Sequence, residues 1–465
     1  MNLTAIIIEG SLDELASALQ ITQDVNLLDE YGYTPLIECV IQNDLEKAKL
    51  IKARGADVNQ ADITGRHALH WAVRNNNLPI SEWLLSCGAN PNAYHLAGEP
   101  VLATPILQQN IKLKNKLAEY GASFTFAYDY INAKLLGHRY ELIGSADIAG
   151  PDNVFIEVDY EGFYLDASLN LIRFSLRNFK ENYAARYIKP WFNQIDAMIE
   201  ALQIASELLT YDHYLFDYRT QAEKIIPLFA RESLIIPINQ EGHAFTLVKS
   251  GSLFAVCDRA RSDEHHLETE IIIDYMNRLS GFQANNMMPL IYEKQSITTI
   301  KDHLKNLLRL QPIASIEMPT QKIGNCSWAN VEAIIPVLHF MLQLNQQNKS
   351  KSKEQLMVDS MELFHRWREW ERQRALQFFL NEFPNATEGR RASIAALLAG
   401  VIFQTCSADN PSDVNRAKKM IKAIKKHHHD YVFDSYLTVY VNQKSTEAGK
   451  NLVRLLEIYE REEAF

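Results

Sequence analysis

Four residues in the central part of the chain have the types and the spacing of a cysteine-based catalytic site. In chain order they are His243, Asp258, Gln321 and Cys326. A cysteine at the start of a helix is favoured as a thiolate by the helix dipole and by free backbone N–H groups. A nearby histidine moves the proton, an aspartate on the paired strand orients the imidazole, and a glutamine just before the cysteine can donate to an oxyanion. Together they predict acyl chemistry through a thioester.

A β-hairpin and a following helix are expected to position these residues. Segments with strand character lie at 233–238, 244–248 and 253–257, with a turn at 249–252. In a tight hairpin, His243 at the start of the middle strand and Asp258 at the end of the return strand come within hydrogen-bond reach. Asp263 in the same loop is the alternative orienting residue; we prefer Asp258 because it directly ends the strand. After Cys326 an apolar pattern with helical spacing continues to a polar linker at 345–353.

The segments around these residues resemble cysteine peptidases of the papain-like superfold. They read GHAFTLV at 242–248, VCD at 256–258 and QKIGNCSW at 321–328. The chain order is similar to the permuted branch that contains ubiquitin-like-protein proteases and the YopJ-type bacterial effectors. The resemblance implies these roles: nucleophile Cys326, base His243, orienting residue Asp258 and oxyanion donor Gln321. Gln321 precedes Cys326 by five positions, where these families usually show six. Because YopJ-type relatives acetylate proteins with the same residues, a hydrolase and an acyltransferase both stay open.

The amino-terminal part of the chain is an internal repeat with a period of 33 residues. Glycines recur at positions 32, 65 and 98, and again at 55, 88 and 121. Residues 32–36 read GYTPL and residues 65–72 read GRHALHWA, which resembles the TPLHxA pattern of the ankyrin repeat. The match spans about residues 1–126, as a half repeat and three further repeats, the last one degenerate. Such units stack into a solenoid, because none of them buries its apolar face alone.

The expected solenoid has two candidate contact areas for a protein partner. Trp71 and Glu38 occupy the variable position of the repeat, which faces the concave surface. An aromatic residue there is a plausible anchor. The hairpin tip with Tyr94, His95 and Leu96 is more apolar than a solvated tip needs to be. We therefore expect the ankyrin repeats to bind a protein through these five residues.

Composition excludes several other classes of function. The 465 residues carry a formal net charge of −10, so the chain as a whole lacks the positive field that attracts nucleic acid. Lys418, Lys422 and Lys425 form part of a basic helix face that we interpret as solvated, and no direct nucleic-acid partner is expected. The longest apolar stretch, 392–403, is too short to span a bilayer, so a soluble protein without membrane insertion is expected. The amino terminus lacks the basic region of a secretory signal peptide.

No metal site or cofactor is expected. The five cysteines have no CxxC spacing, so neither a zinc site nor a disulfide framework is predicted. The histidine clusters at 265–266 and 427–429 lack metal-ligand spacing with a third ligand and are interpreted as solvated surface. The sequence contains no Walker, GxGxxG, HExxH or GxSxG motif. Kinase, nucleotide-binding, zincin and serine-hydrolase functions therefore have no support in the sequence.

Most of the chain looks like the AnkH-like ankyrin-repeat effectors that Legionella injects into host cells. The features that carry this resemblance are the repeats, the segment 134–143, the His-to-Cys array and the Glu-rich end 457–463. It implies a bacterial protein secreted into the host cytosol or nucleus that recruits a host protein and acts on it as a cysteine-protease-like enzyme. The alternative is a non-enzymatic ankyrin scaffold.

The expected fold class is α+β and multidomain. An ankyrin-repeat α-solenoid at 1–126 precedes a papain-like cysteine-protease-fold domain at 127–345, and helical elements at 346–465 extend or cover that domain.

Overall fold

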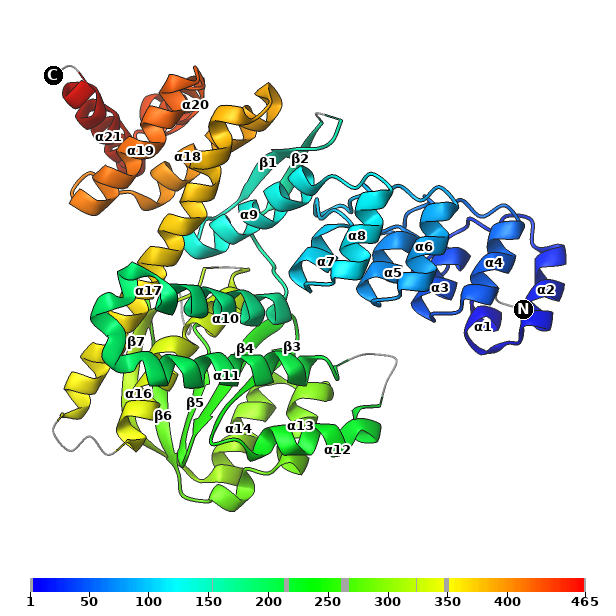
Figure 1. Ribbon diagram of the computed structural model, residues 1–465, viewed down its shortest axis with the longest axis horizontal. Coiled ribbons are helices and arrows are strands. Elements are labelled where there is room, and N and C mark those ends of the chain that lie inside the picture. The colour runs from blue at the N-terminus through cyan, green and yellow to red at the C-terminus, as the bar shows by residue number, and fades with distance from the viewer. Residues whose placement is uncertain are drawn as a thin grey trace. The chain divides into compact units, whose positions relative to one another are not determined.

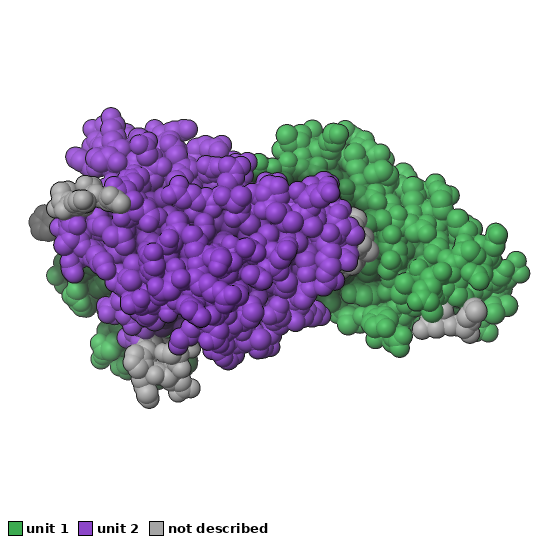
Figure 2. Space-filling view, turned by 90° about the horizontal axis from the view of Figure 1, so that it is seen from below, with its two compact units in different colours: residues 1–134, 145–159, 380–465 green, residues 135–144, 160–379 purple. Residues whose placement is uncertain are grey.

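The structure is a computed structural model that describes residues 3–152, 154–212, 217–260, 267–322, 324–346 and 351–463 (Figure 1). The chain divides into two units (Figure 2). The first contains residues 1–134, 145–159 and 380–465, and the second contains residues 135–144 and 160–379. These units cut the chain at places other than 126 and 345, so the division into three domains stays a prediction.

Four helix pairs form the amino-terminal part of the first unit. They are α1 (Leu3–Glu9), α2 (Leu12–Ile21), α3 (Pro35–Ile41), α4 (Leu45–Ala53), α5 (Ala68–Arg74), α6 (Leu78–Ser86), α7 (Ala103–Leu107) and α8 (Ile111–Glu119). The first pair stands where a half repeat was expected. Thr34 caps α3 by accepting the N–H of Ile37, and Pro35 fills the first helical turn. Gly32 has a φ of 81°, which suits glycine in the hairpin turn before that helix.

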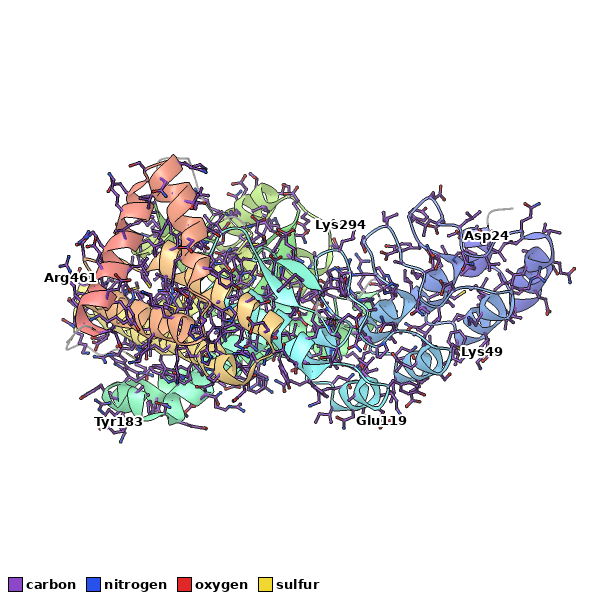
Figure 3. The ribbon with its side chains drawn as sticks, turned by 90° about the horizontal axis from the view of Figure 1, so that it is seen from above. Asp24, Lys49, Glu119, Tyr183, Lys294 and Arg461 are labelled. Carbon is purple, nitrogen blue, oxygen red and sulfur yellow. The ribbon has the colours of Figure 1, made fainter. Side chains whose placement is uncertain are left out.

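A row of asparagines in the 33-residue register ties each repeat to the next. Their Oδ1 atoms accept backbone N–H groups of the following unit: Asp57 to Asn26 (2.7 Å), Asn90 to Asn59 (2.8 Å) and Ser123 to Asn92 (2.7 Å). The side-chain amides of Asn59 and Asn92 also donate to the carbonyls of Gly88 and Gly121, at 3.0 Å each. Polar bonds therefore fix the register of the stack in addition to its apolar core. Figure 3 labels Asp24, in the connection between α2 and α3, and Lys49, on α4.

The rest of the first unit is a small hairpin and a set of carboxyl-terminal helices. Helix α9 (Phe124–Tyr140) leads from the first unit into the second. Strands β1 (Ser145–Ala149) and β2 (Phe155–Asp159) pair antiparallel, and α18 packs against β1. The carboxyl-terminal elements are η5 (Phe383–Asn385), α18 (Glu388–Thr405), α19 (Pro411–Lys426), α20 (Tyr431–Leu437), the π-helix η6 (Thr438–Gln443) and α21 (Glu447–Glu463). The helical elements expected within residues 346–465 are therefore present.

The basic face of α19 is paired with the acidic end of the chain rather than fully solvated. The ion pairs are Lys418 with Glu462 (2.5 Å), Lys422 with Glu463 (3.1 Å) and Lys425 with Glu460 (2.8 Å). Their carboxylates lie in the last two turns of α21, beside Arg461 (Figure 3). The two charge clusters of the sequence therefore compensate each other within the first unit.

The second unit contains a five-stranded antiparallel sheet in the order β3-β4-β5-β6-β7. Its strands are β3 (Ser233–Gln240), β4 (His243–Ser250), β5 (Leu253–Cys257), β6 (Glu268–Met276) and β7 (Leu310–Pro319). Glu241 and Gly242 both have positive φ values, of 53° and 75°, and make a two-residue turn whose twist suits a hairpin. This tight turn makes His243 the first residue of β4. The predicted hairpin is the next one along the chain, and it is confirmed because β4 pairs antiparallel with β5 from Thr246 with Cys257 to Ser250 with Leu253.

Helices cover the sheet and complete the second unit. They are α10 (Leu165–Glu181), η1 (Tyr183–Trp191), α11 (Phe192–Leu209), η2 (Tyr218–Gln221), α12 (Ala222–Ile225), η3 (Ile226–Ala230), η4 (Leu279–Gly281), α13 (Ala284–Tyr292), α14 (Ile297–Leu308), α15 (Cys326–Glu332), α16 (Ile334–Asn345) and α17 (Lys353–Glu382). Alternate β3 side chains, at Leu234, Ile236 and Ile238, share one apolar core with α13 and α14. Helices α15 and α16 pack against β4. The part that follows the ankyrin repeats is thus mostly helical, with two sheets.

Candidate active site

Cys326 is the first residue of α15, as expected. Its side chain is half-buried, and Sγ lies 3.5 Å from the backbone nitrogen of Ala244, which donates to it. At the first position of a helix the backbone N–H groups have no carbonyl partners one turn earlier, so they can stabilise negative charge. The first turn of α15 therefore places the sulfur of Cys326 next to the first residues of β4.

His243 and Asp258 are brought together by the register of the β4–β5 hairpin. Thr246 pairs with Cys257, which places Asp258 beside the start of β4. Nε2 of His243 lies 2.8 Å from Oδ1 of Asp258, and the two side chains are 19% and 6% exposed. The same Oδ1 accepts the backbone N–H of Ala260 at 3.0 Å. Because Asp258 occupies Nε2, the other ring nitrogen of His243 is the one left for the sulfur of Cys326.

The pKa values of these three groups move in the directions of a thiolate–imidazolium pair. Hydrogen bonds with Asp258 and with Cys326 raise the pKa of His243 to about 9. Burial alone would raise the pKa of Cys326, but the hydrogen bonds from His243 and from the N–H of Ala244 outweigh it and lower that pKa. Burial also opposes ionisation of Asp258, yet hydrogen bonds from His243 and Lys301 lower its pKa to about 2. A thiolate beside a charged imidazole is a competent nucleophile.

A lysine contacts the site from α14. Nζ of Lys301 lies 2.8 Å from Oδ2 of Asp258, the oxygen that His243 does not use. The same ammonium is 5.8 Å from the ring centroid of Phe245, and that ring stacks on the imidazole of His243 at 6.0 Å. Lys301 was not predicted, because nothing in its local sequence separates it from Lys305, the other lysine of this helix.

Gln321 makes no hydrogen bond to the cysteine among the residues that the structure describes. Its backbone N–H donates to the carbonyl of Arg259 at 2.9 Å, and its side-chain oxygen is buried without a hydrogen-bond partner. Within the described residues no hydrogen bond joins Gln321 to Cys326 or His243. Its part in an oxyanion hole stays a prediction. The alternative orienting residue Asp263 lies outside the described residues.

Two buried polar residues that sequence reasoning missed hold the site segments together. The Asn330 side chain on α15 donates to the carbonyl of Ala244 and accepts the backbone N–H of Arg259, each at 2.7 Å. It thereby joins the helix of Cys326 to the neighbours of His243 and Asp258. The fully buried Arg259 guanidinium donates to the carbonyl of Pro319 (2.7 Å) and to Glu332 (2.8 Å).

The expected ankyrin contact residues divide into accessible and buried ones. Leu96 and Tyr94 are 79% and 41% exposed. Trp71 is partly buried, and its indole nitrogen donates to Asp62 at 3.0 Å. Glu38 and His95 are only 4% and 6% exposed, so we correct the expectation that a partner reaches them.

The local surroundings of both side chains agree with their burial. His95 bonds to Glu99 at 2.9 Å and accepts the N–H of Ala97 at 3.0 Å, so it shapes the hairpin tip from inside. Burial raises the pKa of Glu38, and the neighbouring Asp29 raises it further. Ile63, which is 63% exposed, stands one repeat before Leu96 and was missed. The 33-residue register could have found it.

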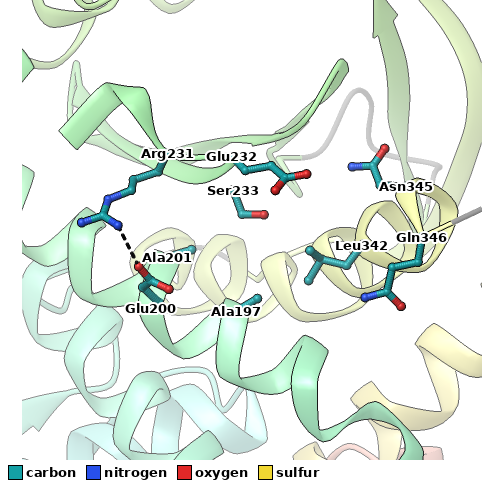
Figure 4. A pocket seen from close by; sticks show the side chains of 9 residues that line it. All are labelled: Ala197, Glu200, Ala201, Arg231, Glu232, Ser233, Leu342, Asn345 and Gln346. Carbon is teal, nitrogen blue, oxygen red and sulfur yellow. Dashed lines mark hydrogen bonds and ion pairs between the residues drawn. The ribbon is translucent and has the colours of Figure 1, made fainter. Parts of the chain in front are cut away.

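A separate cavity of about 410 Å³ opens in the second unit (Figure 4). Its lining comes from α11, the start of β3 and the end of α16, and is Ala197, Glu200, Ala201, Arg231, Glu232, Ser233, Leu342, Asn345 and Gln346. Ser233 pairs with Ser250 at one end of the β3–β4 hairpin, whereas His243 pairs with Gln240 at the other. The cavity therefore contains none of the candidate catalytic residues.

Comparison with known proteins identifies the family. The ankyrin-repeat family, in three copies, matches residues 3–95. The solved structure of the Legionella effector AnkH is 35% identical in sequence, with a TM-score of 0.83, and the match covers 99% of this chain and 97% of the AnkH chain. The chain belongs to the AnkH family. No curated protein matches it. The expected ankyrin repeats and the expected likeness to AnkH are confirmed.

Two further observations bear on ligands and membranes. Among the described residues, no group of three or more His, Cys, Asp or Glu side chains could hold a metal ion. Residues 265–266 lie outside the described ranges, and His429, expected at the surface, is buried with 1% exposure. No helix in the described part of this AnkH-family chain is long and apolar enough to cross a membrane.

Proposed function

We propose that this AnkH-family protein is a translocated bacterial effector that binds a host protein through its ankyrin repeats and cleaves it at the Cys326 site. The five-stranded sheet and the helices within residues 127–345 would then form a papain-like cysteine-protease fold. The single observation that carries the enzymatic part is the chain of contacts from Asp258 through His243 to Cys326, with 2.8 Å between Asp258 Oδ1 and His243 Nε2.

The proposed reaction is hydrolysis of a peptide or isopeptide bond. The Cys326 thiolate attacks the carbonyl carbon, and the resulting oxyanion is held by the backbone N–H of Cys326 and by Gln321. The imidazolium of His243 gives its proton to the leaving amine, which leaves a thioester on Cys326. His243 then takes a proton from water, the hydroxide attacks the thioester, and the thiolate of Cys326 leaves beside the imidazolium. The carboxylic acid product releases its proton to water and departs as a carboxylate.

The proposed docking surface is the row of exposed hairpin tips on the ankyrin repeats. Ile63 and Leu96 occupy equivalent positions, and their side chains are 63% and 79% exposed. Each lies over the turn glycine of the preceding repeat, where a Cβ on Gly32 or Gly65 would come within 3.0 Å of it. Ankyrin repeats generally bind proteins, and an exposed apolar row of this kind is typical of a protein contact surface. The proposed partner is a host protein in the host cytosol or nucleus.

Chemical analysis of host-cell lysate tests this function against its alternatives. Lysate treated with the wild type, with Cys326→Ala or with Leu96→Ser is compared by mass spectrometry for new amino termini and for freed lysine amines. Cys87→Ala, in the ankyrin repeats, is the matched thiol control. Cleavage products that disappear in Cys326→Ala and weaken in Leu96→Ser support the proposal. Acyl groups added only with acyl-CoA present would instead indicate a YopJ-type transferase, and unchanged lysate with retained partner binding would indicate a scaffold.

A further inference from the structure

Both oxygens of the Asp258 carboxylate are used, and two side chains on different elements hold them. Oδ1 faces His243 on β4 at 2.8 Å and also accepts the backbone N–H of Ala260 at 3.0 Å. Oδ2 faces Lys301 on α14 at 2.8 Å. A carboxylate fixed at one oxygen can still rotate about its side-chain bonds, whereas one fixed at both oxygens keeps its direction.

We propose that Lys301 is a positioning residue of the candidate active site, which holds Asp258 at Oδ2 so that Oδ1 stays aligned with His243. This inference rests on the proposed function, because it concerns the same site. Among the described residues, the polar partner of Lys301 is Asp258 and no hydrogen bond joins it to the sulfur or the imidazole, so the proposed effect passes through Asp258. The site then has four consecutive members, from Lys301 through Asp258 and His243 to Cys326.

Burial makes this ion pair unlike an ordinary surface pair. Most exposed pairs contribute almost nothing, because water and salt screen both charges. Here the Asp258 side chain is only 6% exposed, and only the lysine, at 43%, is well hydrated. A buried carboxylate with one positive partner removed loses part of the compensation for its desolvation. The shared Phe245 ring, which both the ammonium and the imidazole approach, further limits where the lysine head can lie.

The helix that carries Lys301 is well anchored. Ser296 caps α14 by accepting the N–H of Thr299, and Ile300, Leu304 and Leu308 are buried in the core beside the sheet. The backbone at Lys301 is therefore fixed, while its side-chain tip remains exposed. Substituting it leaves no cavity in the core, so the variants described next are expected to fold.

The test is the pH dependence of iodoacetamide alkylation at Cys326 in the full chain, measured for Lys301→Met. Without the lysine, Asp258 is held at one oxygen only, so His243 is aligned less well and the thiolate is less stabilised. The pH at the midpoint of the alkylation profile is expected to rise by about half a unit or more. Lys301→Arg keeps a charged donor and should restore the wild-type profile. Lys305→Met removes the same charge one turn further along α14 and should leave the profile unchanged.

A double variant decides whether Lys301 acts through Asp258. If it does, Lys301→Met adds no further shift in an Asp258→Asn background. A shift that persists in that background would mean that the lysine charge acts directly, and it would overturn the proposal. A wild-type profile for Lys301→Met, or an equal shift for Lys305→Met, would also overturn it.

The same assay separates failure of this inference from failure of the proposed function. If His243→Ala alkylates as the wild type does, the candidate site itself is not coupled and the proposed function fails. If His243→Ala is slow and Lys301→Met behaves as the wild type, the site stands and only the role of Lys301 is refuted.

Discussion

Removing the side chain of Asn330 is expected to loosen the candidate site more than its distance from the sulfur suggests. Asn330 is fully buried, and its amide makes two hydrogen bonds of 2.7 Å, to the carbonyl of Ala244 and from the N–H of Arg259. Asn330→Ala leaves both backbone groups buried without a partner. Each such group costs about 1–3 kcal/mol. The free energy of local unfolding around the site should therefore fall by about 2–6 kcal/mol.

Hydrogen exchange followed by mass spectrometry measures this loss where it is expected. Peptides from β4 and α15 should exchange faster in Asn330→Ala, while ankyrin peptides keep their rates. The matched control is Asn178→Ala, because Asn178 is exposed on α10 and changes of this kind usually stay within about 0.5 kcal/mol. Unchanged exchange in β4 and α15 would refute the reasoning that Asn330 joins the cysteine helix to the hairpin.

Two further predictions concern stability. Burial lowers the pKa of His339 to about 3, so below about pH 6.5 the unfolded chain binds a proton that the folded chain does not. The second unit should lose stability as the pH falls from about 6.5 towards 3, and thermal melts should show a smaller loss for His339→Gln; equal losses would contradict this. Asn59→Ala removes bonds to Asn90 and Gly88 and should cost the ankyrin repeats about 1 kcal/mol in chemical denaturation. Gln60→Ala is its control, and equal midpoints would contradict the prediction.

The hairpin of the candidate site could be predicted because its determinants are local. Strand residues, a short turn and a return strand place His243 and Asp258 side by side, and only their neighbours in sequence matter. The partners of Asn330 lie 71 and 86 residues away along the chain, and Lys301 is 43 residues from Asp258. No local pattern encodes such contacts. Gln321 was chosen because it closely precedes Cys326 and because the family resemblance implies an oxyanion donor there, and its side-chain oxygen has no hydrogen-bond partner in the structure.

The ankyrin repeats illustrate the same division between local and distant information. The 33-residue period predicted the helices and the exposed tip at Leu96, since every repeat reports on the others. The period did not reveal that Glu38 is buried or that His95 turns inward to Glu99. Those outcomes depend on which side chains neighbouring repeats bring together, and a repeat pattern does not contain that information.

The central claim is that Cys326 and His243 form an activated pair, and the pH dependence of iodoacetamide alkylation at Cys326 tests it most directly. Peptide mass spectrometry reads the modification in the wild type and in His243→Ala. Since the pKa of Cys326 is lowered and that of His243 is raised to about 9, wild-type labelling should be fast well below about pH 8.5 and should become slow in the variant. Equally slow labelling in both proteins, with the pH profile of an ordinary thiol, would contradict the account.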